Sequence, residues 1–233
     1  MKKRVFYSEL AYVIGIITLA IGTAFMERAD FGVSMVVAPP YILHLKVSEF
    51  LPFFSFGMAS YTFQAALLIA MMIILRRVRI KYFLSLVTAV IYGLCLDLSM
   101  IAIANIPFEP LALRVGFYVL GMLLCSASIS LLFHTYIPPE AYELFVKEIS
   151  EKFGFSISKV KTVYDCSSCL LAILMSFIFF GLWHFEGVKL GTVVCALLNG
   201  TLIGLFTKAF ERFWEFRNRF SFEVQSSSNK KDD

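Results

Sequence analysis

Six apolar runs, each close to the length of a membrane-crossing helix, constrain this chain of 233 residues more than any other feature. A helix needs about 20 apolar residues to cross the hydrocarbon core of a bilayer, and lipid admits helices because their backbone hydrogen bonds close internally. Charged residues make up only 16% of the chain, against about 25% in a soluble domain. The sequence therefore predicts an all-α, polytopic membrane protein with about six transmembrane helices, and it excludes a cytosolic enzyme, a disordered chain and a secreted disulfide scaffold. The predicted spans are Leu10–Met26, Phe53–Leu75, Tyr82–Ala104, Val115–Phe133, Val163–Trp183 and Gly191–Phe210.

The first run follows the basic stretch Lys2-Lys3-Arg4, as the apolar region of a signal peptide also does. Glu27-Arg28-Ala29, which comes directly after the run, has no small-x-small cleavage pattern. A retained span is therefore favoured over a cleaved signal.

Lysine and arginine are distributed unequally between the two sides that six spans define. With the N-terminus inside, 17 of them fall on inner segments and four on outer segments. Because cytoplasmic loops of membrane proteins are rich in these residues, we expect a plasma-membrane protein with both termini in the cytoplasm. The net charge of +4 then reports orientation, and no nucleic-acid partner is predicted. The four outer residues are Arg28, Lys46, Arg114 and Lys189.

Two further segments are too short or too polar to span. Phe31–Leu45 is mostly apolar but contains Pro39-Pro40, which would break a continuous helix. Pro138–Phe153 has apolar residues at helical spacing and is predicted to form an amphipathic helix. Each segment follows the first span of a group of three, so both are expected to be re-entrant or amphipathic elements in equivalent places.

The sequence also matches itself weakly. Phe54-Ser55-Phe56 resembles Phe155-Ser156-Ile157 at an offset of 101 residues, and Ala89–Gly93 resembles Ala196–Gly200 at an offset of 107. The second pair are small-xxx-small steps, so Ala89, Gly93, Ala196 and Gly200 are predicted to pack helices closely.

An odd number of spans in each copy makes the second copy enter the membrane from the opposite side. We therefore predict two inverted three-helix repeats, at residues 1–104 and 105–211, and a cytoplasmic polar tail at 212–233. Inverted repeats around a central site are a common plan among transporters.

Glycine-rich motifs give a family resemblance. Gly187, Gly191-Thr192, Ala196-Leu197 and Gly200 resemble the G-x-GT-hydrophobic-AL-x-G motif of the YczE/YitT-like bacterial membrane proteins, and Ala29–Ser34 resembles the stretch after their first span. The C-terminal soluble domain of YitT-like members is absent, which places the resemblance nearer the YczE-like branch. The resemblance implies a fold and a membrane location, and it implies no substrate.

Polar residues in or beside the spans are the candidates for solute binding, because charge at membrane depth is costly. Asp97 in the third span is either a proton, cation or substrate site or an interfacial residue. Asp165 opens the fifth span and either functions there or pairs with Lys161. Gln64 and Asn199 either contact solute or join helices, and Asp30 either lines the mouth of a re-entrant segment or lies in a solvated loop.

Cys166 and Cys169 form a Cys-x-x-Cys pattern, which redox proteins use. Small semi-polar residues at a helix-packing face would have the same pattern. No phosphate-binding glycine loop, zinc-protease helix or nucleophile elbow is present in the sequence.

The sequence thus predicts a permease for a small solute, driven by an ion gradient or acting as a substrate-capture subunit, with neither cofactor nor metal. Its expected partners are the bilayer, the solute and either a second copy or a separate energising subunit. The alternatives are a thiol–disulfide redox protein that uses Cys166 and Cys169, and a non-transporting accessory protein.

Overall fold

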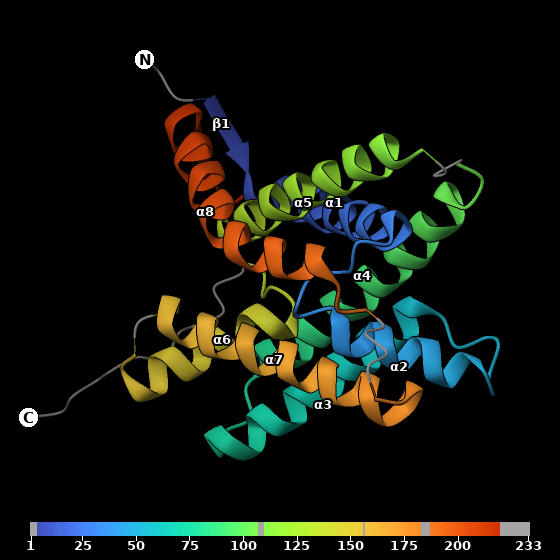
Figure 1. The fold of residues 1–233 in the computed structure, drawn as a ribbon. Helices are drawn as coiled ribbons and strands as arrows, with labels where there is room; N and C mark the ends of the chain where they lie inside the picture. Colours follow the sequence, from blue (N-terminus) through green and yellow to red (C-terminus); the bar gives the residue numbers. More distant parts are fainter. Residues whose placement is uncertain (1–3, 107–109, 156, 183–186, 220–233) are drawn as a thin grey trace, which may run out of the picture.

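Eight helices and two short strands form the part of the chain that the computed structural model describes, residues 4–106, 110–155, 157–182 and 187–219 (Figure 1). Six of the helices are long and apolar enough to cross a membrane, which confirms the prediction of six such helices. The elements are β1 (Arg4–Tyr7), α1 (Ser8–Ala29), α2 (Ala38–Ser48), α3 (Phe56–Leu75), α4 (Ile80–Ile103), α5 (Leu111–Phe133), α6 (Ala141–Phe153), α7 (Ile157–Phe180), α8 (Leu190–Phe213) and β2 (Trp214–Arg217).

The two short helices occupy the segments that the sequence singled out. Pro39 and Pro40 lie in the first turn of α2, where a missing N–H breaks no intrahelical bond, so they start a helix there. α6 places Ala141 and Leu144 against Leu68 of α3 and Tyr82 of α4. The amphipathic face of α6 is therefore covered by the protein's own helices.

Two short strands accompany this predominantly helical fold, and the second lies within the segment predicted as a polar tail from residue 212. α8 continues to Phe213, and β2 then pairs in parallel with β1, with Arg4 opposite Trp214. Alternating apolar and charged residues in Trp214–Arg217 give this strand one side that packs, where the Phe6 ring lies 5.4 Å from that of Trp214. The predicted turn at Pro107, the end of the fifth run at Trp183 and the residues from 220 onward lie outside the described residues.

α1 and α5 form the centre of the bundle and run antiparallel. Gly22 of α1 faces Gly121 and Cys125 of α5, and Gly15 faces Leu132. A Cβ on Gly22 would lie 2.8 Å from the carbonyl oxygen of Gly121, so only glycine permits this approach.

Contacts around this pair repeat in the two halves of the chain. α4 runs parallel to α1, with Tyr92 donating to Thr23 (3.0 Å), and α8 runs parallel to α5, with Ser126 donating to Asn199 (2.9 Å). Each short helix packs on the second long helix of the other half, α2 on α7 and α6 on α3 (Figure 1).

The connector before each short helix is also held by the opposite half. Ser85 of α4 donates to the Pro139 carbonyl (2.7 Å), and Thr192 of α8 donates to the Val33 carbonyl (2.8 Å). Ser85 and Thr192 are 107 residues apart, the same offset as the Ala89 and Ala196 motifs.

Basic segments gather at one end of the bundle. There, β1 and β2 lie beside the start of α1, and Arg79 of α4 pairs with Glu148 of α6 (3.5 Å). At the opposite end, Asp30 pairs with Arg114 (3.3 Å) and with Lys189. The segments assigned to the lysine- and arginine-rich side are therefore together, and we call this side the basic end.

Large apolar side chains on the outside of the bundle suit a lipid environment. Ile73, Ile178 and Leu197 are each more than 70% exposed although they lie in membrane-length helices. A surface of this kind is unfavourable in water and matches the hydrocarbon of a bilayer.

Candidate functional site

A cavity of about 580 Å³ lies between α7 and α8, a size typical of small-molecule sites. α6 and the C-terminal end of α5 complete its walls, so it lies in the half of the bundle toward the basic end, with the exposed Lys147 at its rim. The lining residues are Leu132, Phe133, Thr135, Pro139, Glu143, Val146, Lys147, Lys161, Thr162, Asp165, Ala196, Asn199, Gly200 and Ile203.

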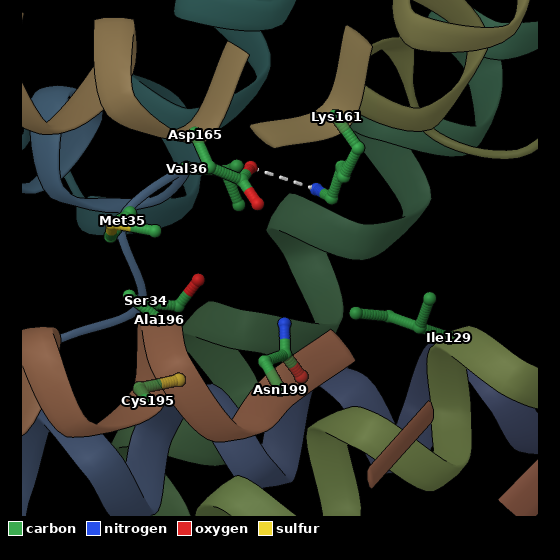
Figure 2. A pocket seen from close by; sticks show the side chains of 9 residues that line it. All are labelled: Ser34, Met35, Val36, Ile129, Lys161, Asp165, Cys195, Ala196 and Asn199. Carbon is green, nitrogen blue, oxygen red and sulfur yellow. Dashed lines mark ion pairs between the residues drawn. The ribbon is translucent and has the colours of Figure 1, made fainter. Parts of the chain in front are cut away.

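A small pocket of about 20 Å³ extends this cavity toward the connector before α2 (Figure 2). Lys161, Asp165, Ala196 and Asn199 line both spaces, and the pocket adds Ser34 and its two successors from the connector. Because these shared residues stand between the two spaces, polar groups from α7 and α8 lie at the deep end of the cavity.

Three charged side chains form a cluster in the cavity wall. Lys161 Nζ lies 3.0 Å from Asp165 Oδ1 on the next turn of α7 and 4.0 Å from Glu143 Oε1 on α6. Their side chains are 24%, 20% and 10% exposed, respectively. Burial raises the pKa of Glu143; the Lys161 ammonium acts in the opposite direction, and the Asp165 carboxylate raises it further.

Asn199 supplies a neutral polar group beside this cluster. Its Oδ1 accepts a hydrogen bond from Ser126 of α5 (2.9 Å), which fixes the orientation of the amide. Figure 2 shows its nitrogen on the side that faces Lys161 and Asp165. Two of the predicted residues, Asp165 and Asn199, are thus brought together in one cavity.

Gln64 lies elsewhere, in a buried network between α3 and the start of α6. Its Nε2 donates to Glu140 Oε2 (2.9 Å), and the Ala141 backbone N–H donates to its Oε1 (3.0 Å). Burial raises the pKa of Glu140 well above its usual value; Glu143 adds to this effect, and the Gln64 hydrogen bond opposes it. In this structure Gln64 therefore joins α3 to α6.

Asp97 joins α4 to the N-terminus of α3. Its carboxylate accepts from Ser55 Oγ (2.5 Å) and from the Gly57 backbone N–H (2.8 Å), while Ser55 caps α3 by accepting from Met58 N–H (3.0 Å). A helix N-terminus favours negative charge, so this placement satisfies the carboxylate without a cation. Asp97 is absent from the cavity lining.

Asp30 belongs to the opposite end of the bundle. It ends α1 with a positive φ of 59°, and its side chain is 63% exposed where it pairs with Arg114 and Lys189. This ion pair joins the ends of α1, α5 and α8 and has no place in the cavity.

The small residues predicted to pack helices behave differently in the two halves. At Gly93 of α4 a Cβ would lie 2.8 Å from the Gly57 carbonyl oxygen, so α3 and α4 are in close contact, and Ala89 is fully buried. At Gly200 no atom outside its own stretch of helix lies within 4 Å of that point among the described residues. The close packing predicted at Gly200 is therefore corrected. Ala196 and Gly200 both line the cavity between α7 and α8.

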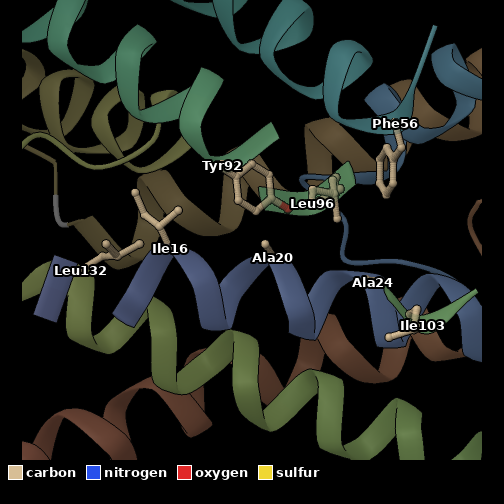
Figure 3. Packing of buried hydrophobic residues seen from close by; sticks show 9 residues of the cluster. Ile16, Ala20, Ala24, Phe56, Tyr92, Leu96, Ile103 and Leu132 are labelled. Atoms are coloured by element: carbon tan, nitrogen blue, oxygen red, sulfur yellow. The ribbon is translucent and has the colours of Figure 1, made fainter. Parts of the chain in front are cut away.

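In the first half, buried apolar side chains of α4 pack against α1 and against Phe56 at the start of α3 (Figure 3). Tyr92 and Leu96 of α4, both fully buried, pack with Phe56 of α3 against Ile16 and Ala20 of α1. The 107-residue offset relates Leu96 to Ile203, which lines the open cavity.

Cys166 and Cys169 are free thiols outside the cavity lining, and Cys166 is exposed. The described residues contain no group of three or more histidine, cysteine or acidic residues arranged to hold a metal ion.

A family model describes most of this chain. The model is that of a family of unknown function (DUF6198), and it matches residues 6–208. The chain belongs to this family. No curated protein and no solved structure gives a significant match.

For this DUF6198 member, sequence reasoning missed Glu143 and Lys161 as site residues, and it missed Glu140 as the partner of Gln64. The signal was present, because α6 carries Glu143 between the buried Ala141 and Leu144, and Lys161 lies one turn before Asp165. The sequence does not show that α6 packs against α7, and without that knowledge these features are typical of a solvent-exposed helix face.

Proposed function

We propose that this protein is a permease for a small solute that works by alternating access between two inverted repeats. The observation that carries the proposal is the cavity between α7 and α8, together with the closed contact between α3 and α4 at matching positions. A transporter built from inverted repeats holds its two halves in different conformations, and exchanging the conformations moves the opening to the other side.

The repeated contacts support the inverted relation. An antiparallel α1–α5 pair at the centre, the parallel partners α4 and α8, and the exchanged packing of α2 and α6 are what a two-fold axis in the membrane plane would produce. Such an axis relates Ser85 to Thr192, and each of these donates to the connector of the other half.

We also propose the side on which the cavity opens. It lies toward the basic end, and lysine- and arginine-rich loops stay in the cytoplasm, so the described state faces inward. The proposed place is the plasma membrane, with both termini inside. The motifs at Ala29–Ser34 and Gly187–Gly200 support kinship with the YczE-like branch.

Labelling with a membrane-impermeant maleimide tests this proposal. Ile203→Cys and Leu96→Cys are made in a chain whose five native cysteines are replaced by serine or alanine, and Ala20→Cys serves as a buried control. We expect Ile203→Cys to react in inverted vesicles and Leu96→Cys to react in intact cells, while the control reacts in neither.

Two results would contradict alternating access. Reaction of Ile203→Cys and Leu96→Cys from the same side would place both regions on one face. If Leu96→Cys reacts from neither side, α3 and α4 do not separate, and the cavity is a fixed pocket.

A further inference from the structure

We propose that Glu143, Lys161 and Asp165 form a site for one exchangeable proton, which couples solute movement through the cavity to a proton gradient. This inference rests on the proposed permease and names its coupling ion. The structure places two carboxylates and one ammonium group from two helices in the wall of one cavity.

The charge of the cluster is the first step of the argument. With all three groups ionised, one ammonium faces two carboxylates, which leaves one uncompensated negative charge. Because the three side chains are 10–24% exposed, such a charge is poorly solvated and is disfavoured. One proton on either carboxylate makes the cluster neutral.

The geometry decides which carboxylate is less satisfied. Asp165 Oδ1 forms an ion pair with the ammonium at 3.0 Å although it accepts no hydrogen bond, whereas Glu143 Oε1 lies 4.0 Å from the ammonium and its side chain is only 10% exposed. The raised pKa of Glu143 agrees with this difference. The proton is therefore held mainly by Glu143, and Asp165 remains paired with Lys161.

Other ionisable groups near the cluster do not remove the excess charge. Glu140 on the same side is a further buried acidic group, so it supplies no positive charge. Lys147 is exposed to solvent at the rim of the cavity. Tyr164 and Cys195 carry no positive charge in either protonation state. No further cation lines the deep pocket.

The proton balance of one transport cycle follows. In the described state the Glu143 carboxylate takes a proton from a hydronium ion in the cavity, which leaves a water molecule, and becomes a neutral carboxylic acid. When the cavity closes and the opposite side opens, the same O–H bond breaks and the proton leaves to that side. No electron is transferred, and no other reactant is needed.

Counting protons on the purified protein tests the inference without any solute. Protein in detergent is titrated from about pH 9 to about pH 5.5, a range that lies above the pKa of an exposed glutamate and in which a glutamate with a pKa raised by burial takes up its proton. Compared with wild type, Glu143→Gln is expected to take up about one proton fewer per molecule. Glu151→Gln, an exposed position on the same helix, is the matched control and should equal wild type.

Substitutions at two more residues, Asp165 and Lys161, distinguish one proton shared by the cluster from carboxyl groups that titrate independently. Asp165→Asn should also lose about one proton, because Glu143 then has Lys161 to itself and stays ionised. Lys161→Gln should gain about one, since both carboxylates then lack a cation. Lys161→Arg keeps the charge and should equal wild type, and it serves where Lys161→Gln fails to give a monodisperse protein.

Unchanged uptake in Glu143→Gln, or loss of a proton in Lys161→Arg, would overturn the proton site. Either result leaves the maleimide experiment untouched, so failure of the proton site can be told apart from failure of the permease. If Glu143→Gln and Asp165→Asn lose their protons in separate pH ranges, the groups titrate independently, and the shared site is also wrong.

Discussion

The contact between α3 and α4 and the gap between α7 and α8 are built from similar sequence and differ in packing. Gly93 and Gly200 occupy matching steps, yet the first lies against Gly57 and the second faces a cavity. Small residues permit close approach of helices but do not enforce it. The difference shows that the same motif serves a closed and an open interface within one molecule.

The largest effect is expected at the closed interface. A methyl group at Gly57 would meet the Gly93 carbonyl oxygen and the Asp97 carboxylate, so Gly57→Ala should destabilise the protein by about 1–3 kcal/mol. Gly200→Ala meets no neighbouring atom and should be neutral or stabilising by up to about 1 kcal/mol. The thermal unfolding midpoint in detergent measures both. Equal losses in the two variants would remove the distinction between the interfaces.

Asp97 gives the second largest effect, because it joins the closed pair through two hydrogen bonds. Asp97→Ala leaves Ser55 Oγ and Gly57 N–H without this acceptor, and we expect a loss of about 1–2 kcal/mol. Asp97→Asn is the comparison, since its amide oxygen still accepts one of the two bonds, and it should cost less. If Asp97→Ala keeps the wild-type midpoint, the carboxylate does not hold α3 to α4.

Substitution of Glu140 is expected to have a smaller effect on stability, and this effect depends on pH. Its folded pKa lies above the unfolded value of about 4.3, so between these values the native chain holds more protons than the unfolded one, and stability falls as pH rises. Glu140→Gln removes this loss and keeps an acceptor for Gln64. We expect the advantage of the variant over wild type to be larger at pH 8 than at pH 5. A constant difference between the two pH values would show that Glu140 does not titrate in this window.

The smallest effect is expected on α7, where the 101-residue offset relates Cys166 and Cys169 to Ala65 and Leu68 of α3. Since a permease needs no thiol, Cys166→Ser with Cys169→Ser should leave the unfolding midpoint and the proton count unchanged. The intact mass of the alkylated wild-type protein should be the same with and without a reductant. A disulfide that forms in the membrane and alters either measurement would favour the redox alternative.

Sequence reasoning located the membrane-length helices because their length and polarity are local properties. It also located α2 and α6, since prolines and apolar spacing mark them. It did not locate the site with the same success. Asp165 and Asn199 meet in the cavity, whereas Gln64 meets Glu140, because the partner of each depends on how far apart its helices stand. The residue at the matching position in the other half, 101 residues away, does not indicate how far apart these helices lie.

The cap that Asp97 forms could not be predicted for a related reason. Nothing between Ser55 and Asp97 along the chain indicates that α4 presents its carboxylate to the first turn of α3. The free-energy cost of burying a charged side chain depends on the groups that pair with it, and only tertiary packing brings those groups close. An acidic residue inside an apolar run should therefore first be tested for a hydrogen-bonding partner within the protein, and only then for a role in solute binding.

The pairing of β1 with β2 sets the moment at which synthesis can complete the fold. Arg4 and Trp214 are 210 positions apart, so the first strand emerges from the ribosome almost a whole chain before its partner. Until then β1 offers unpaired backbone groups to any other strand. Contacts this distant in sequence form late, so the arrival of β2, more than the insertion of any single helix, is the step that pairs β1 with its own chain.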